Sequence, residues 1–342
     1  MLNNIVTNLE NATAETPLAP ELVMAAMQGY QMTQVIVVAT KLGIFQNLGS
    51  EKKNLCDLAA SLNVNKVWLD DLLEMLCSLS LLRKENGLYE VTTLGEMLTL
   101  ESPRSFNGTV LSIYDTFRAW GSLYDAYAES SSGFKKAFGV EMYDFLNSNK
   151  GSEAAFANWM KESHREKVLP LLRKVDLGRH ASYLDLGGSQ GALASYLSKE
   201  YPNARVTVFE RQSVVDVVEE EVYRSNVRYD FVAGDFFDLV PDGHSAYFLS
   251  RVLLNWSDAD AIQILRNVKK ALGEDSKLYV IDFMLPDNDR NASQLIASLH
   301  LIAIGGRNMR REQEYLNMFS ESGFEKVTKL ESHGHLSLYE LS

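Results

Sequence analysis

Cysteine, proline and basic charge are all scarce in this chain. Its 342 residues include two cysteines, seven prolines, and 33 lysines and arginines against 45 aspartates and glutamates, which gives a net charge of −12. Cys56 and Cys77 have no partners at metal-ligand spacing, so we expect buried apolar side chains rather than a disulfide or a zinc site. Such an acidic chain disfavours contact with a phosphate backbone, so nucleic acid is not an expected partner.

Long apolar runs and a secretion signal are also missing from the sequence. Residues 1–19 are polar and lack a basic start followed by an apolar core, and we expect this segment to be poorly ordered. No stretch approaches the roughly 20 apolar residues that a membrane helix needs. We therefore expect a cytoplasmic protein with no membrane partner, and no cluster of metal-ligating residues indicates a metal.

The N-terminal third contains two patterns that predict its fold. From Pro20 to Leu42 the sequence is helical, and apolar residues cover nearly every face of its second half, so this helix should be buried in a core or against a second copy. Residues 54–91 then read as helix, turn, helix and hairpin, with Glu85-Asn86-Gly87 at the hairpin turn. This order is typical of a winged helix-turn-helix.

DNA binding is the first function that a winged helix suggests. Here the second helix carries the acidic residues Asp70, Asp71 and Glu74, which are unsuited to a phosphate backbone. A structural or dimerisation role is therefore favoured, and a DNA-binding regulator that senses a ligand stays open as an alternative.

Residues 105–175 are helical and rich in aromatic side chains. Most of these predict a helical core, but a planar aromatic ligand also needs aromatic and methionine walls. Trp120 and Met160 are the candidates for such walls.

From Ala181 onward, strands alternate with helices. The expected strands are 183–186, 206–209, 229–233, 246–249 and 277–283, with helices between them that include 213–221; a helix at 312–322 and a hairpin-like pair at 325–341 follow. This order predicts an α/β fold with a doubly wound parallel sheet and a ligand at the carboxyl ends of its strands.

The glycine-rich stretch from Asp185 to Gly191, DLGGSQG, joins the first of these strands to its helix. Glycines let the backbone approach a ligand and leave the helix N-terminus open. Glu210 ends the next strand, where an acidic side chain can accept hydrogen bonds from ribose hydroxyls. Because the turn is not the dinucleotide pattern G-x-G-x-x-G, another nucleoside-bearing cofactor is indicated.

Several motifs together make the chain resemble one family. They are ATKLGIFQNL, MKESH, DLGGSQG, VFE, GDFF, SRVLLNWSDADAIQIL and GGRNMRREQEYLNMFSESGF. Over residues 20–342 the chain is similar to the S-adenosylmethionine-dependent small-molecule O-methyltransferases of the plant caffeate and bacterial antibiotic type. The resemblance implies a homodimer with a winged-helix dimerisation domain (1–104), a helical linker that contributes to the substrate pocket (105–175) and a Rossmann-like catalytic domain (176–342).

The resemblance also implies residue roles. Candidates for binding S-adenosylmethionine are the residues beside its methionine part (Gly187, Gly188, Gly191 and Ser163), at its ribose (Glu210), at its adenine (Asp235 and Phe236) and closing over it (Ser250 and Arg251). A small aromatic acceptor would contact Trp120, Met160, Leu254 and Trp256.

The sequence departs from the family at one triplet. Relatives carry a histidine base in His-Asp-Trp, where this chain has Leu254-Asn255-Trp256, and leucine cannot accept a proton. The acceptor then needs no base, or another residue supplies one, or the fold performs other chemistry such as hydroxylation, decarboxylation or a pericyclic step.

The catalytic candidates are His300, on an apolar helix, and Asn255 of the triplet, with His164 as a second possible base. The remaining histidines, His180, His244, His333 and His335, are expected at the surface.

Overall fold

The computed structural model describes residues 19–216, 218, 228–288 and 290–342. The chain divides into two compact units, Met1–Glu162 and Ser163–Ser342, and each has its own buried core. The sequence predicted poor order for residues 1–19, and all of these except Ala19 lie outside the described residues. Much of the expected helix 213–221 lies outside them as well. The three-part division with boundaries at 104 and 175 stays a prediction.

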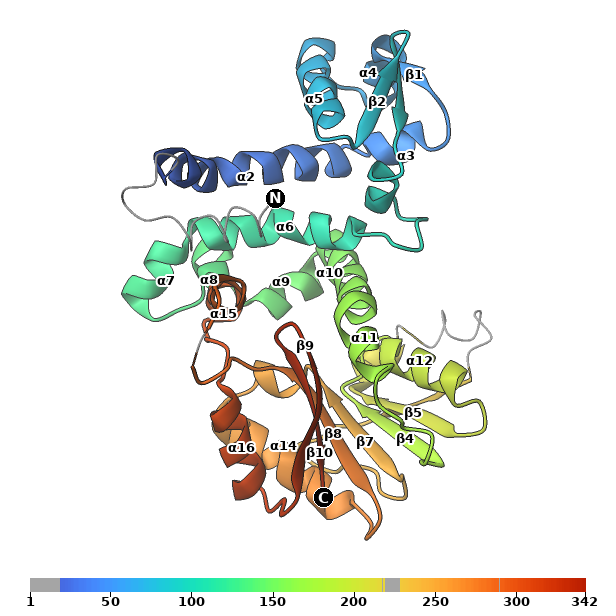
Figure 1. Ribbon diagram of the computed structural model, residues 1–342, viewed down its shortest axis with the longest axis vertical. Helices are drawn as coiled ribbons and strands as arrows, with labels where there is room; N and C mark the ends of the chain where they lie inside the picture. Colours follow the sequence, from blue (N-terminus) through green and yellow to red (C-terminus); the bar gives the residue numbers. More distant parts are fainter. Residues whose placement is uncertain (1–18, 217, 219–227, 289) are drawn as a thin grey trace. The chain divides into compact units, whose positions relative to one another are not determined.

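The first part of unit 1 is the expected winged helix (Figure 1). Two short antiparallel pairings form a sheet of order β1-β3-β2 beside the helices. The elements are α2 (Ala19–Lys41), α3 (Ile44–Leu48), β1 (Lys53–Asn54), α4 (Leu55–Leu62), α5 (Lys66–Ser78), β2 (Leu82–Glu85) and β3 (Leu88–Val91).

Local sequence signals set these boundaries. Asn54 and Asn65 cap α4 and α5, because their side-chain oxygens accept from the backbone N–H groups of Asp57 and Val67, each at 2.9 Å. The hairpin turn is Asn86-Gly87, and Gly87 takes a φ of 78° that glycine adopts without strain. The winged helix therefore follows from capping, turn chemistry and apolar periodicity.

The second part of unit 1 is helical. It contains η1 (Gly95–Leu98), α6 (Asn107–Gly121), α7 (Leu123–Glu129), α8 (Gly133–Phe138), α9 (Met142–Ser148) and α10 (Lys150–Ser163), whose last residue belongs to unit 2.

Glu162 joins α10 to the start of α6. The side chain of Glu162 is buried, and its two carboxylate oxygens accept from the backbone N–H groups of Gly108 at 2.8 Å and Thr109 at 2.7 Å, and from the Thr109 hydroxyl at 2.6 Å. The helices cross so closely that a Cβ at Gly108 would lie 2.5 Å from the Cβ of Asn158. A buried carboxylate thus satisfies the free N–H groups of a helix N-terminus.

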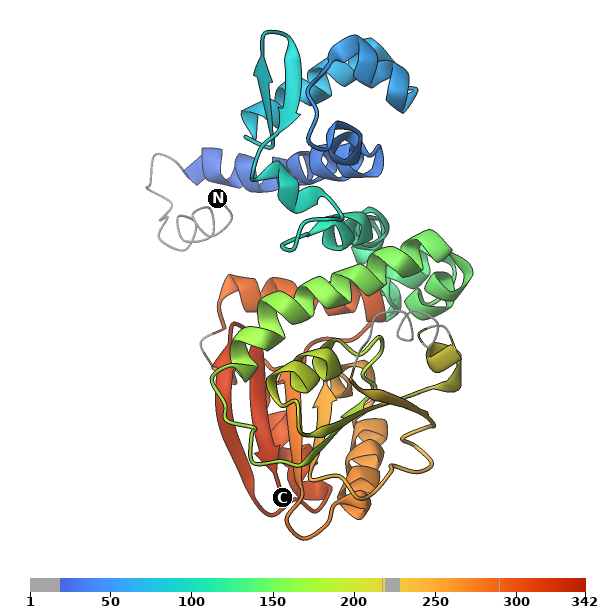
Figure 2. The ribbon, with the colours of Figure 1, turned by 90° about the vertical axis from the view of Figure 1, so that its right-hand side faces the viewer.

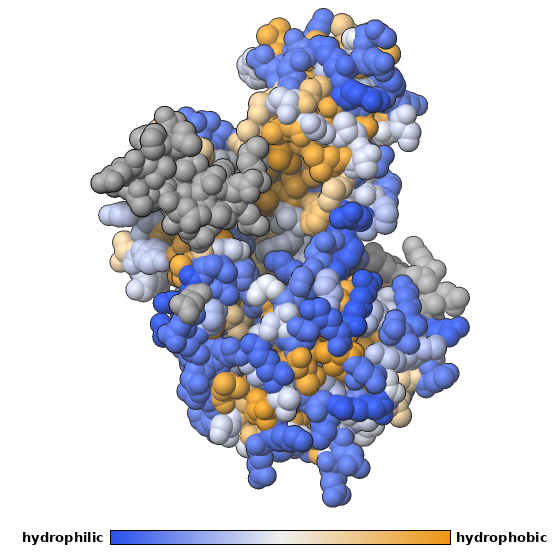
Figure 3. All heavy atoms as spheres, viewed as in Figure 1, coloured by the Kyte–Doolittle hydropathy of each residue, from blue (hydrophilic) through white to orange (hydrophobic). Residues whose placement is uncertain are grey.

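The long helix α2 lies along α6, as both views show (Figures 1 and 2). Tyr30 stacks on Phe117, with ring centroids 6.3 Å apart, and the Lys41 ammonium sits over the ring of Tyr114. Much of α2 nevertheless has apolar side chains exposed, and Met27 is 65% accessible. Figure 3 shows apolar side chains gathered on the surface of unit 1.

Unit 2 is built on a seven-stranded sheet of order β6-β5-β4-β7-β8-β10-β9. Strands β4 to β8 run parallel, whereas β10 pairs antiparallel with both β8 and β9. The strands are β4 (Ser182–Leu186), β5 (Arg205–Glu210), β6 (Asp230–Ala233), β7 (Ala246–Ser250), β8 (Lys277–Phe283), β9 (Val327–His333) and β10 (Leu336–Leu341). The other elements are η2 (His164–Val168), α11 (Leu169–Leu172), α12 (Ala192–Glu200), η3 (Leu253–Asn255), α14 (Asp258–Ala271), α15 (Ala292–Gly305) and α16 (Glu312–Glu321).

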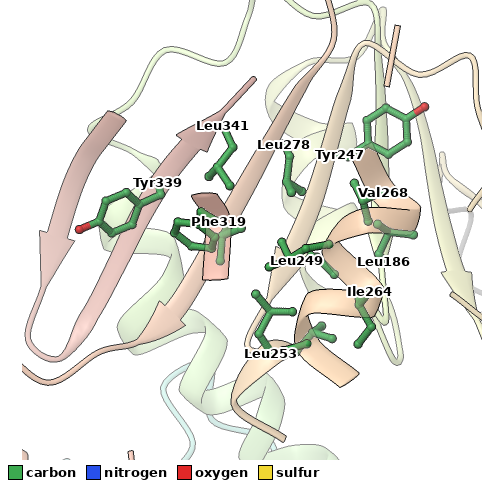
Figure 4. Close-up of a cluster of buried hydrophobic side chains, with 14 of the residues drawn as sticks. Leu186, Tyr247, Leu249, Leu253, Ile264, Val268, Leu278, Phe319, Tyr339 and Leu341 are labelled. Carbon is green, nitrogen blue, oxygen red and sulfur yellow. The ribbon is translucent and has the colours of Figure 1, made fainter. Parts of the chain in front are cut away.

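Alternating strand residues build a core on each face of this sheet. On one face, Leu186, Leu249 and Leu278 pack against α14 and α16, as the close-up shows (Figure 4). On the other face, Tyr183 and Phe248 pack against α11 and α12. Helices on both faces make the sheet doubly wound, as predicted. No helix among the described residues has the length and apolar character to cross a bilayer.

Three expectations about single residues were wrong. Cys56 is exposed rather than buried, and both cysteines are free. His180 and His244 are buried rather than at the surface. Each finds a polar partner, because the Nε2 atom of His180 lies 2.8 Å from the Tyr279 hydroxyl and the Nδ1 atom of His244 lies 3.2 Å from the Asp242 carbonyl.

The carboxylate of Glu162 gives a test of the packing of unit 1. Replacing Glu162 by alanine leaves the buried N–H of Gly108 and the part-buried N–H of Thr109 without this acceptor. We therefore expect the free energy of unfolding to fall by about 3 kcal/mol. Glu166→Ala is the control, because Glu166 is partly exposed and pairs with the neighbouring Arg165; it should change stability by less than about 0.5 kcal/mol. Chemical denaturation measures both, and equal stability of Glu162→Ala and the wild type would contradict this role.

Candidate active site

The expected site residues come together at the carboxyl edge of the parallel strands. Strands β4, β5 and β7 are neighbours in the sheet and end at Leu186, Glu210 and Ser250. The glycine turn follows β4, and Asp235 follows β6, the next strand beyond β5. One edge of the sheet thus carries most of the predicted cofactor residues, as the parallel order requires.

The turn after β4 can be built only with glycine at several positions. Gly187 and Gly191 take left-handed φ angles of 68° and 77°. A Cβ at Gly188 would lie 2.4 Å from an oxygen of Asp185, and one at Gly191 would lie 2.6 Å from the ring of Tyr229. Gly191 is also the N-cap of α12, so the helix starts with open backbone N–H groups directly at the turn.

Glu210 holds this turn from the end of β5. Its carboxylate oxygens accept from the backbone N–H of Ser189 at 3.1 Å and from its neighbour Arg211 at 2.9 Å. The side chain is 12% exposed. Since each carboxylate oxygen has two lone pairs, Glu210 keeps acceptor capacity for a ligand hydroxyl.

Asp185 is the buried acid beneath the turn. Burial, and secondly the charge of Glu210, raise the pKa of this carboxyl to about 7, and the Arg251 guanidinium opposes the rise. Its Oδ2 atom, the Ser250 hydroxyl and the side-chain oxygen of Gln190 are buried with no hydrogen-bond partner among the described residues. Three orphaned polar atoms at one strand edge indicate a site for a polar ligand.

Arg251 directly follows β7 and contacts Ser163, the last residue of α10. The guanidinium donates from Nη1 to the hydroxyl of Ser163 at 3.1 Å, and the backbone N–H donates to Ile281 at 2.7 Å. The residue has a φ of 58°, a conformation that costs a non-glycine residue energy and often marks a functional site. Directly after Ser163 the helix widens into the π-turn η2, another feature that is frequent at functional sites.

Asp235 and Phe236 follow β6. Asp235 is exposed, and its Oδ1 atom accepts from the Phe237 N–H at 2.8 Å, which fixes the direction of the carboxylate. The ring of Phe236 meets the ring of Trp256 edge to face, with centroids 5.8 Å apart. The structure thus brings Phe236, predicted to pack on adenine, into contact with Trp256, predicted to contact the acceptor.

The Leu254-Asn255-Trp256 triplet is held firmly although it lacks a histidine. Leu254 is half-buried in η3, and its backbone N–H donates to the buried Asp282 at 3.0 Å. Arg310 donates to the carbonyls of Leu253, at 2.7 Å, and of Trp256. The exposed Asn255 donates from its side chain to the Arg251 carbonyl at 3.2 Å. Both flanks of the triplet are therefore fixed by charged side chains.

The anchors Asp282 and Arg310 were missed in the sequence. Burial raises the pKa of the Asp282 carboxyl to about 7. The sequence did hold one signal for Asp282, because it is an acidic residue inside the apolar strand LYVIDF. Burying a carboxyl group costs free energy unless the group is hydrogen-bonded.

The remaining candidates lie on helices. His300 is half-buried on α15, and burial, then the Lys167 ammonium, lower its pKa to about 4. His164 is buried in η2, and burial, then Arg251, lower its pKa to about 3. Trp120 and Met160 are half-buried on α6 and α10 of unit 1, and their role stays a prediction.

No group of three or more histidine, cysteine or acidic side chains among the described residues has the geometry of a metal site. The arrangement instead offers a close-packed glycine turn, two carboxylates on neighbouring strand ends and three orphaned polar atoms. Such a set is suited to a small ligand with hydroxyl and amino donors.

Comparisons with known proteins agree with this architecture. A sequence model of the O-methyltransferase domain matches residues 120–325, more than half of the chain, and one of the O-methyltransferase dimerisation domain matches residues 24–101. The phenazine O-methyltransferase of Lysobacter antibioticus is 25% identical over 96% of this chain and 98% of that relative.

Solved structures of the same family superpose over nearly the whole chain. The mitomycin 7-O-methyltransferase has a TM-score of 0.84 and 26% identity, covering 96% of this chain and 99% of that one. Human N-acetylserotonin methyltransferase, solved in complex with S-adenosylmethionine, has a TM-score of 0.86 and 25% identity over the same shares. The fold, the strand edge and these matches together show that the chain belongs to the O-methyltransferase family of S-adenosylmethionine-dependent methyltransferases.

Proposed function

We propose that this enzyme methylates a small, planar aromatic acceptor of secondary metabolism, at oxygen or nitrogen. The names of the similar proteins support an acceptor of this class, since they specify phenazine, mitomycin and N-acetylserotonin. The half-buried aromatic side chains of Phe236 and Trp256, in contact beside the glycine turn, are suited to planar rings.

The observation that carries the proposal is the fit of the strand edge to S-adenosylmethionine. In this proposal Glu210 accepts from the ribose hydroxyls, Asp235 accepts from the adenine amino group, and Phe236 packs on the adenine ring. The glycine turn, with Ser163, Ser250 and Arg251, surrounds the methionine part. The oxygens of Asp185 and Ser250 that have no hydrogen-bond partner among the described residues then bond to this part of the ligand. When bound, S-adenosylmethionine supplies an electrophilic methyl group on its sulfonium.

Leu254 determines how this chain can assist the transfer. A leucine at that position shapes the acceptor side of the pocket and excludes water, but it takes no proton. Holding two reactants in line supplies up to roughly 7–11 kcal/mol of the barrier, so orientation alone can carry much of the catalysis. The rigid anchoring of the triplet by Asp282 and Arg310 supports this role, with Asn255 fixing the backbone at Arg251.

Where the acceptor does lose a proton, His300 is the proposed base. Its imidazole stays neutral above about pH 5, because burial and the Lys167 ammonium lower its pKa to about 4. A neutral imidazole can accept a proton from an acidic phenol.

A homodimer is the proposed assembly. The match to a dimerisation domain includes most of α2, and α2 leaves Met27, Tyr30 and Met24 at least half exposed in the single chain. An apolar helix face of this kind is typically covered by a partner. Location in the cytoplasm stays a prediction.

The first experiment tests methyl transfer and the cofactor site together. The purified enzyme is incubated with methyl-labelled S-adenosylmethionine and a panel of phenols and N-heterocycles, and we expect label in at least one product. Asp235→Ala should weaken cofactor binding at least tenfold by calorimetry, since a lost hydrogen bond costs about 1–3 kcal/mol. Asp238→Ala, at an exposed acid three residues away, is the control for this binding measurement. In the labelling assay, tight cofactor binding without any labelled product would favour other chemistry on the same fold.

His300→Ala tests the base. We expect kcat on a phenol acceptor to fall about 100-fold with unchanged cofactor affinity. Protonation of His300 should not reduce the wild-type rate until the pH falls to about 4, where the imidazole becomes charged. His333→Ala, at an exposed position, serves as the control, and an unaltered rate in His300→Ala would dismiss the residue as base.

Met27→Glu tests the assembly. We expect a dimer for the wild type by sedimentation velocity and a monomer for this variant, because a buried unpaired charge opposes association. Leu239→Glu is matched to it, since Leu239 is 74% exposed in unit 2 and should leave the dimer intact. A dimeric Met27→Glu would place the interface elsewhere.

A further inference from the structure

A buried asparagine contacts the loop that follows β6. Asn267 lies in the second half of α14, and it is 7% exposed. A buried amide costs free energy unless its polar atoms are hydrogen-bonded. Here both the nitrogen and the oxygen have partners, and the partners of the nitrogen belong to the loop that carries Asp235.

The amide nitrogen of Asn267 donates to two consecutive carbonyls of this loop. Its Nδ2 atom lies 3.0 Å from the carbonyl oxygen of Phe236 and 2.8 Å from that of Phe237. Because an amide nitrogen carries two hydrogens, one side chain can satisfy both carbonyls. A single residue of α14 thus holds the backbone of the loop at two points.

The amide oxygen fixes the orientation of the Asn267 side chain. It accepts from the Lys270 ammonium at 3.2 Å and from the Gln263 amide nitrogen at 3.1 Å. These residues are three and four positions away on α14, so they share a helix face with Asn267. Since an ammonium can only donate, the oxygen must face Lys270 and the nitrogen must face the loop.

One peptide unit joins Asn267 to the carboxylate of Asp235. The carbonyl of Phe236 and the N–H of Phe237 belong to the same planar group. Asn267 holds the carbonyl, and the N–H donates to the Oδ1 atom of Asp235 at 2.8 Å. A rotation of this peptide unit would break both hydrogen bonds and release the exposed carboxylate from its direction.

The start of the loop is held separately, by the sheet. Gly234 donates its backbone N–H to the carbonyl of Glu210 at 3.0 Å, and a Cβ at Gly234 would lie 2.5 Å from the ring of Phe209. These contacts hold the backbone before Asp235, and Asn267 holds the backbone after it. Asp235 therefore lies between two anchors, of which one is a side chain that can be replaced.

We infer that Asn267 is a positioning residue for the recognition of adenine. It acts through the peptide unit between Phe236 and Phe237, which sets the direction from which the Asp235 carboxylate accepts from the adenine amino group. This inference rests on the proposed function, in which Asp235 contacts that amino group. It adds a residue that determines selectivity for the base without touching the cofactor.

Calorimetric binding of two probes to the full chain tests the inference. The probes are S-adenosylhomocysteine and the same compound built on unsubstituted purine, in which hydrogen replaces the amino group. We expect the wild type to bind the adenosyl compound about tenfold more tightly, because only this compound offers Asp235 a donor. Asp235→Ala should remove this preference.

Two variants of Asn267 remove the NH2 group and approximately keep the side-chain volume. Asn267→Leu and Asn267→Asp should each reduce the preference for the adenosyl compound to less than about threefold, because the loop carbonyls lose their donor. Asn267→Asp retains a partner for the Lys270 ammonium, so this variant is the one expected to fold best.

A double variant and a control separate positioning from a merely structural role. Adding Asn267→Leu to Asp235→Ala should weaken S-adenosylhomocysteine binding by less than about twofold further, because residues that act through one interaction are not additive. Leu338→Val is the control, since Leu338 is fully buried in β10 on the other face of the sheet. It should lower stability and keep the full preference.

The outcomes distinguish this inference from the proposed function. A preference that survives both Asn267→Leu and Asn267→Asp overturns the inference, and so does an additive loss in the double variant. If the wild type shows no preference, the adenine contact of Asp235 and the role of Asn267 fail together. Because binding is measured without turnover, the expected preferences without any labelled methyl product would sink the proposed methylation alone.

Discussion

The hydrogen bond from the Ser189 backbone to Glu210 joins the glycine turn to the neighbouring strand. Everything at the site depends on this junction. The turn is so tight that no side chain fits at Gly188 above the buried Asp185, and the same turn starts α12. One carboxylate thus fixes the backbone that a ligand must approach and still has lone pairs for that ligand. The binding edge is in this sense assembled before any ligand arrives.

Acidic side chains are concentrated on the β4 to β6 side of the same edge. Asp185, Glu210 and Asp235, at the ends of β4, β5 and β6, are suited to the hydroxyl and amino donors of adenosine. Arg251, beside β7, balances this acidic side, because its guanidinium stabilises the charge of Asp185 and disfavours protonation of His164.

Much of this architecture could be predicted from the sequence, because local signals specify it. Capping asparagines, the Asn86-Gly87 turn and the strand–glycine–helix pattern act over a few residues, and parallel topology then gathers the strand ends. The misplaced His180 and the missed Arg310 depend on distant partners instead. His180 is buried because Tyr279, far along the chain, offers a hydroxyl, and Arg310 reaches back to carbonyls around Leu254. No short-range pattern encodes such pairs.

The π-turn after Ser163 has a consequence for how the family diversifies. In a regular α-helix, residues four apart lie on one face, so Ser163 and Lys167 would point in the same direction. The wider turn separates them, and Ser163 meets Arg251 while Lys167 meets Phe283. Two positions four residues apart in one helical segment can then evolve independently. In a duplicated gene, codon 167 can therefore change while the contact between Ser163 and Arg251 persists.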